Sequence, residues 1–292
     1  MRLLVTGGSG FLGGHVLAAA ARRGHEVLAL ARSPGAARAV AGAGARPVSG
    51  DLDDSRQVGE AFLMARCDVL VTLSSLGYGH GPAIIAAAER AGIRRAVFVS
   101  TTAVTTSLDP PTKRIRLAAE DQIMASALDW TILRPTMIYG TPQDRNLSRL
   151  LTMLCRTPVF PVPGGGVHLH QPVHVADVAA AVLAAAERGH AARRSYDVAG
   201  PRPMPFIELL RESAAAVGRR VAFVPVPLWP LVALARACER LTPRPGIRAE
   251  QLLRLAEDKA FAIDAAVRDL SYAPRAFAPG IRDQARAMGL AA

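Results

Sequence analysis

A glycine-rich turn close to the N-terminus constrains the fold more than any other feature of this sequence. Residues 6–13 read TGGSGFLG, directly after the apolar run Arg2–Val5 and at the start of a helical pattern over Gly13–Arg23. Glycines at such a bend let the backbone approach a pyrophosphate, whose charge is held by N–H groups at the helix N-terminus. The string satisfies both GxGxxG and GxxGxxG, and its place between a strand and a helix predicts a dinucleotide site. The residues expected to contact the dinucleotide here are Gly7, Gly10, Phe11, Leu12 and Gly13.

The first two thirds of the chain alternate short apolar runs with helical patterns, as a parallel sheet covered by helices does. The expected strands are Arg2–Val5, Glu26–Ala31, Val69–Leu73, Ala96–Val99 and Thr131–Leu133. The expected helices are Gly13–Arg23, Ser55–Ala65, Pro82–Ala91 and Arg116–Ala127. Such repeated β-α-β units predict an α/β fold with a doubly wound parallel sheet, a Rossmann fold.

The pattern changes after Pro135 to proline-rich loops and mostly helical segments, with no polar linker between the halves. We therefore expect residues 1–135 to form a dinucleotide-binding Rossmann core and residues 136–292 a smaller, mostly helical C-terminal substrate subdomain. Residues 171–200 are expected to return to the core. The helices expected in this half are Asn146–Cys155, Val175–Arg188, Pro205–Val217, Leu228–Leu241 and Glu250–Glu257.

Composition excludes several classes of protein. A chain of 292 residues that is 50% hydrophobic can bury a large core, which excludes general disorder. The three cysteines lie far apart, with neither a zinc-ligand spacing nor a disulfide framework, and favour a reducing compartment. The longest apolar stretch, Val224–Ala235, is interrupted by prolines, and no signal-peptide core follows Met1. We expect a cytoplasmic protein without an integral membrane segment.

The net charge of +11 does not indicate a nucleic-acid partner, because the basic residues are spread along the chain. Of 35 lysine and arginine residues only two are lysines, Lys113 and Lys259. Phosphorylated small molecules remain natural ligands, and a monomer or homodimer is expected. The Leu228–Leu241 helix has one apolar face, which predicts packing on a core, with peripheral membrane contact as the alternative.

Five segments together resemble the short-chain dehydrogenase/reductase superfamily, in its extended and atypical branches of NAD-dependent epimerase/dehydratase-like proteins. They are TGGSGFLG at 6–13, GDL at 50–52, VFVSTT at 97–102, LRPTMIYG at 133–140 and QPVHVADVA at 171–179. The resemblance covers essentially the whole chain. It implies an NAD(P)-dependent oxidoreductase or epimerase-like protein that acts on a small polar or nucleotide-linked substrate.

Arg32 favours NADP over NAD as the cofactor. It follows the second strand, where an NAD-specific site carries an acidic residue for the ribose hydroxyls and where an arginine can bind a 2′-phosphate. The alternative is a solvated surface side chain. The resemblance places Asp51 at the adenine; the alternative is a carboxylate that only stabilises a turn. The resemblance also places the backbone after Pro135 near the nicotinamide. The other residues expected along the cofactor are Leu52, Ser74 and Met137.

The catalytic positions are where the sequence departs from the family. Thr102 fits the Ser/Thr that holds the reacting oxygen, but the chain contains no YxxxK. Alignment on Glu120 puts Thr112 and Arg116 at the tyrosine and lysine positions, and alignment on Lys113 puts Asp109 at the tyrosine. Lys113 is the expected substitute, since a partly buried lysine can exchange a proton and an arginine cannot. The alternative for Lys113 is a solvated loop residue.

The substrate is expected to contact Tyr139, Arg145 and Gln171. The histidines in HLHQPVH at 168–174 match the family's substrate-edge strand, so we expect no metal site. Asp177 is expected to cap the following helix.

Two functions remain open at this point. The first is hydride transfer with Thr102 polarising an oxygen and Lys113 or a water supplying the proton. The second is a non-enzymatic NADP(H) sensor or scaffold, as the NmrA-type redox regulators and an accessory subunit of respiratory complex I are. The missing tyrosine favours the second, and the full-length substrate half favours the first.

Overall fold

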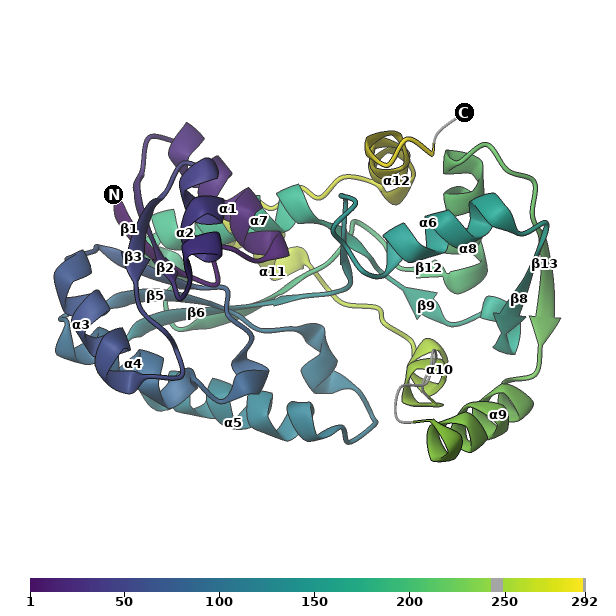
Figure 1. Cartoon of the computed structure of the whole chain (residues 1–292), viewed down its shortest axis with the longest axis horizontal. Coiled ribbons are helices and arrows are strands. Elements are labelled where there is room, and N and C mark those ends of the chain that lie inside the picture. The colour runs from purple at the N-terminus through teal and green to yellow at the C-terminus, as the bar shows by residue number, and fades with distance from the viewer. Residues whose placement is uncertain (243–248, 291–292) are drawn as a thin grey trace.

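The computed structural model describes residues 1–242 and 249–290 and consists of two lobes (Figure 1). The N-terminal lobe is built on a seven-stranded parallel sheet with the order β11-β6-β5-β4-β1-β2-β3. The chain reverses direction across the sheet beside β1, which is the topological switch point where such folds bind dinucleotides. The predicted doubly wound fold is therefore confirmed. The strands are β1 (Arg2–Thr6), β2 (Glu26–Ala31), β3 (Arg46–Ser49), β4 (Val69–Thr72), β5 (Arg95–Val99), β6 (Asp129–Pro135) and β11 (Arg194–Val198).

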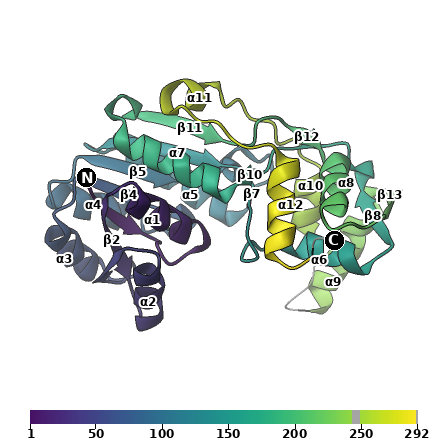
Figure 2. The same cartoon turned by 90° about the horizontal axis from the view of Figure 1, so that it is seen from above.

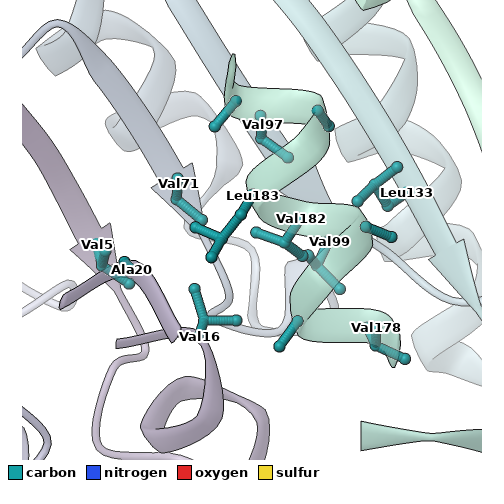
Figure 3. Close-up of a cluster of buried hydrophobic side chains, with 14 of the residues drawn as sticks. Val5, Val16, Ala20, Val71, Val97, Val99, Leu133, Val178, Val182 and Leu183 are labelled. Atoms are coloured by element: carbon teal, nitrogen blue, oxygen red, sulfur yellow. The ribbon is translucent and has the colours of Figure 1, made fainter. Parts of the chain in front are cut away.

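Helices cover both faces of this sheet because the strands alternate apolar side chains between them. Leu3 and Val5 of β1 point to one face, and Leu4 points to the other. The first face is covered by α1 (Phe11–Arg22), α2 (Pro34–Gly42), α7 (Val175–Glu187) and α11 (Asp264–Leu270). The second face is covered by α3 (Ser55–Ala65), α4 (Gly81–Arg90) and α5 (Pro111–Ala125). Figure 3 shows side chains of α1 and α7 meeting the strands, among them Val16, Ala20, Val178, Val182 and Leu183.

The C-terminal half crosses back to the sheet twice. First, α7 packs against α1, and β11 pairs in parallel with β6. Later, α11 packs on α7 and β11, a return that the sequence analysis does not predict. Asp269 of α11 fixes this return by accepting hydrogen bonds from Arg194 at 2.8 Å and Tyr196 at 3.1 Å.

The second lobe has its own core beside the carboxyl ends of the strands. Its helices are α6 (Leu147–Arg156), α8 (Phe206–Ala216), α9 (Leu228–Leu241), α10 (Ala249–Leu255) and α12 (Phe277–Ala287). Three two-stranded pairs complete it: β7 (Ile138–Tyr139) with β10 (Val173–His174), β9 (Leu169–His170) with β12 (Met204–Pro205), and β8 (Val159–Pro163) with β13 (Ala222–Val226). Helix α12 packs against α8, α6 and β10 at the junction of the lobes (Figure 2).

Helices α11 and α12 lie where no helix is predicted, and α2 and α5 differ from the prediction for local reasons. Helix α2 lies in a Gly/Ala-rich stretch where no helix is predicted, and it starts with a Ser33 cap, whose Oγ accepts from the Ala36 N–H at 3.2 Å, followed by Pro34. Helix α5 starts at Pro111 rather than Arg116, so Lys113 lies in its first turn. Among the described residues no helix is long and apolar enough to cross a membrane.

Candidate active site

A cavity of about 1730 Å³ connects the glycine turn with the second lobe. Its walls come from the start of α1, the loop after β5, the segment after β6 and the chain that follows α10. The volume exceeds the ~300–1000 Å³ of ordinary small-ligand sites, so it has room for a dinucleotide together with a second molecule. Residues expected from the sequence that lie on its wall are Gly10, Phe11, Thr102, Met137, Arg145 and Gln171.

The glycine turn fits a pyrophosphate. Gly7 has φ +73° and its carbonyl accepts from the Gly10 N–H at 3.1 Å, which closes the turn ahead of α1. No side chain of the described residues caps α1 at Gly10, and the first turn holds no acidic residue, so its N–H groups can serve an anion. A Cβ on Gly13 would overlap the carbonyl oxygens of Gly7 and Gly8. Gly13 therefore lets helix and turn pack together, and Gly10 faces the cavity.

The remaining dinucleotide positions surround the same sheet edge. The Ser74 Oγ donates to the Thr6 Oγ1 at 3.0 Å, which joins the ends of β4 and β1. The Asp51 carboxylate accepts a hydrogen bond from the Asp53 N–H at 3.2 Å, so it stabilises a turn, as the alternative given above for this residue expects. Leu52 is partly buried beside the core. Arg32 is exposed directly after β2 and has no hydrogen bond or ion pair with any described residue. Its guanidinium is available to a phosphate.

Thr102 lies on the cavity wall at the start of the 3-10 helix η2 (Thr102–Thr105). It is buried, and its Oγ1 donates to the Pro135 carbonyl at 3.3 Å, a long hydrogen bond. A hydroxyl held this loosely can turn toward a ligand oxygen. Below it, the buried Glu120 accepts from the Ser100 hydroxyl and from Arg134, which fixes the ends of β5 and β6 on α5.

Lys113 does not line the cavity. Its Nζ donates to the main-chain carbonyl of Thr106 at 2.6 Å and to that of Leu108 at 3.5 Å. These bonds hold the loop ahead of α5. The structure thus gives Lys113 a loop-stabilising contact and does not bring it to Thr102.

The three expected substrate residues have different positions. Arg145 is exposed on the cavity wall. Gln171 also lines the cavity, but its amide is engaged, donating to the Gly200 carbonyl at 2.7 Å and accepting from the Phe261 N–H at 2.8 Å. Tyr139 is only 1% exposed, and its ring packs between His174 and Phe277 away from the cavity, where burial raises its pKa. The structure does not bring Tyr139 to a substrate.

The expected capping role of Asp177 is wrong. Helix α7 is capped by His174, whose Nδ1 accepts from the Ala176 N–H at 3.2 Å. Asp177 lies inside the first turn and binds the guanidinium of Arg275 in two places, at 3.0 and 2.8 Å. The carboxylate therefore ties α7 to the segment ahead of α12 instead of closing the helix end.

Polar side chains line much of the cavity, and Lys259 and His170 are among those that the sequence did not single out as site residues. His170 is 5% exposed, and its Nε2 has no hydrogen-bond partner among the described residues. Burial lowers the pKa of His170 to about 4, so the ring is neutral near pH 7. Burial also lowers the pKa of Lys259 to about 8. His170 lies in the HLHQPVH segment that resembles the family's substrate-edge strand, and the signal for Lys259 is the rarity of lysine in this chain.

Comparison with known proteins agrees with this geometry. The sequence model of a family described as NAD(P)H-binding matches residues 7–188. A 4-hydroxy-2-methyl-3-oxo-4-farnesyl-3,4-dihydroquinoline-1-oxide ketoreductase of Stigmatella aurantiaca is 32% identical, over 94% of this chain and 92% of the relative. A 2-alkyl-3-oxoalkanoate reductase of Stenotrophomonas maltophilia is 28% identical, over 94% and 95%. The solved UDP-glucose 4-epimerase of Thermotoga maritima with UDP-glucose has a TM-score of 0.77 at 18% identity and 99% coverage of both chains, a likeness of fold.

Proposed function

Because the chain belongs to the NAD(P)H-binding family and is an NAD(P)-dependent oxidoreductase of the atypical short-chain type, we propose that it reduces the ketone of a lipophilic 3-oxo compound with NADPH. The observation that carries this proposal is one continuous cavity that runs from the glycine turn to a group of apolar side chains in the second half of the chain. This substrate differs from the small polar or nucleotide-linked molecule expected from the sequence.

The far end of the cavity favours an apolar substrate. Its partly buried side chains come from the C-terminal half of the chain, and they are Leu150, Phe206, Leu255 and Phe261. Such side chains gain free energy from burying the alkyl groups of a substrate. Two relatives that align over almost the whole chain carry names of reductases of 3-oxo compounds with farnesyl or alkyl groups, which supports this choice.

Residues near the sheet edge would hold the cofactor and orient the ketone for the reaction. The turn at Gly10 and the start of α1 would hold the pyrophosphate, and Met137 would lie beside the nicotinamide. When bound, NADPH supplies a hydride to the carbonyl carbon. Thr102 would donate a hydrogen bond to the ketone oxygen, which stabilises the negative charge that develops there.

The test is turnover of a series of 2-alkyl-3-oxoalkanoates of increasing chain length, followed by the loss of NADPH absorbance. Each additional buried CH₂ contributes about 0.8 kcal/mol, so kcat/KM should rise about fourfold per carbon until the cavity is full. UDP-glucose, offered in the same assay and in an epimerase assay, is the matched polar substrate. Conversion of UDP-glucose without reduction of any 3-oxo compound would refute the proposal.

Cofactor choice is expected to depend on Arg32. A charge-assisted contact with the 2′-phosphate contributes ~1.5–3 kcal/mol, so Arg32→Ala should weaken NADPH binding about 10- to 150-fold and NADH binding little. Calorimetric titration of both dinucleotides measures this. Arg236→Ala, which removes the same charge from the exposed side of α9, is the control and should change neither affinity. A wild-type preference for NADH would overturn the assignment.

A further inference from the structure

Lys259 reaches the active-site cavity from the chain that follows α10. Its Nζ donates to the Arg254 carbonyl at the end of that helix, and its main-chain N–H donates to the Leu169 carbonyl at 2.7 Å. An ammonium group has three donors, so this contact leaves two for a ligand. Lys259 lines the same cavity as Gly10 and Thr102.

The two residues before Lys259 fix its position against both lobes. Glu257 accepts hydrogen bonds from the Thr106 Oγ1 at 2.6 Å and from the Ser107 N–H at 2.7 Å, in the loop that begins with Thr102. Asp258 accepts from the Leu169 N–H at 2.8 Å, on the substrate side. The chain on the N-terminal side of Lys259 is therefore fixed to both sides of the cavity. The carboxylates of Glu257 and Asp258 are engaged in these hydrogen bonds.

The surroundings of Lys259 leave its charge poorly compensated. Burial is the main cause that lowers its pKa, to about 8; Arg254 lowers it further and Glu257 raises it. The other charged or titratable groups around it are the exposed Asp258, the half-buried His168 and the neutral His170. No carboxylate of the described residues lies within 4.0 Å of Nζ. A lysine tuned in this way can release its proton near neutral pH, which suits an acid catalyst.

We propose that Lys259 is the proton donor that replaces the missing tyrosine, and this rests on the ketone reduction proposed above. As the carbonyl carbon accepts the hydride that NADPH supplies, the carbonyl π pair moves to oxygen, and that oxygen takes a proton from Nζ. The products are the secondary alcohol, NADP⁺ and a neutral amine, which regains its proton from water. The buried Nε2 of His170, without a protein partner, is a second hydrogen-bonding group for the substrate on the same wall.

Kinetics test the role first. Lys259→Met and Lys259→Arg should lower kcat by ~10²–10⁴-fold while NADPH binding stays nearly unchanged, because arginine keeps the charge but does not give up a proton. Lys113→Arg, which keeps a donor for the loop carbonyls, is the matched control for Lys259→Arg and should retain kcat. Wild-type ketone reduction should fall as pH rises through about 8, because the donor must be protonated. Full kcat in Lys259→Met would overturn the proposal.

A second measurement does not depend on turnover. Because the chain holds only two lysines, protein grown with [ε-¹³C]lysine gives two lysine signals, and Lys113→Arg assigns them. The Lys259 signal should titrate near pH 8, and it should shift when a 3-hydroxy product binds together with NADP⁺. An unshifted Lys259 signal in a complex with bound product would overturn the role of Lys259 but not the proposed reductase. Failure of any 3-oxo compound or product to bind or react would instead overturn both.

Discussion

Gly13→Val is expected to abolish dinucleotide binding and to destabilise the fold. A Cβ at this position would overlap the Gly7 and Gly8 carbonyl oxygens and lie 2.6 Å from the Gly8 carbonyl carbon. Because these are main-chain atoms, the turn must move away from α1, at a cost of about 1–3 kcal/mol in the free energy of unfolding. Losing two charge-assisted hydrogen bonds to the pyrophosphate weakens NADPH binding at least about 100-fold.

Two other glycines separate these effects. A Cβ on Gly10 would meet only the Gly7 carbonyl oxygen, at 3.3 Å, and would point at the cavity. Gly10→Val should therefore remove NADPH binding with little change in the melting temperature. Gly42→Ala in α2, where a Cβ meets nothing within 4 Å, should retain both properties. Tight NADPH binding by Gly13→Val would contradict the assigned site.

Thr102→Val is expected to lower kcat by ~10²–10³-fold, the usual cost of removing one donor to a developing oxyanion. Valine has nearly the same shape, and the hydrogen bond that is lost within the protein is the long one to the Pro135 carbonyl. Stability and NADPH affinity should therefore change little. Thr102→Ser keeps the hydroxyl and should restore most of the rate. Equal kcat in the valine variant and the wild type would remove Thr102 from the mechanism.

The fold could be predicted because its signals are local. Buried parallel strands such as Val69–Thr72 are short apolar runs in the sequence. The glycine turn indicates the first βαβ unit. Strands β8 and β13 could not be predicted in the same way, because VFPVP and AFVPV contain prolines, which lack the N–H that a ladder requires. They pair only with each other, where a missing donor is tolerated.

The site was only partly predictable because it joins distant parts of the chain. Thr102 and Gly10 follow strands, so sheet topology alone brings them to one edge. Lys259 lines the same cavity because Glu257 and Asp258 contact residues far away in sequence. Such contacts leave no periodic pattern in the sequence, so they could not be predicted from it. Lys113 and Tyr139 had chemically suitable side chains, but one bonds loop carbonyls and the other is enclosed by the second core.

The most direct test of the proposed reduction is isotope transfer. The wild-type protein is incubated with NADPH that carries deuterium on the transferred position of nicotinamide C4, together with a 2-alkyl-3-oxoalkanoate, and the product is analysed by mass spectrometry. We expect a 3-hydroxy product with one deuterium on the carbinol carbon. An unreacted ketone alongside bound NADPH, or a product without deuterium at that carbon, would contradict it.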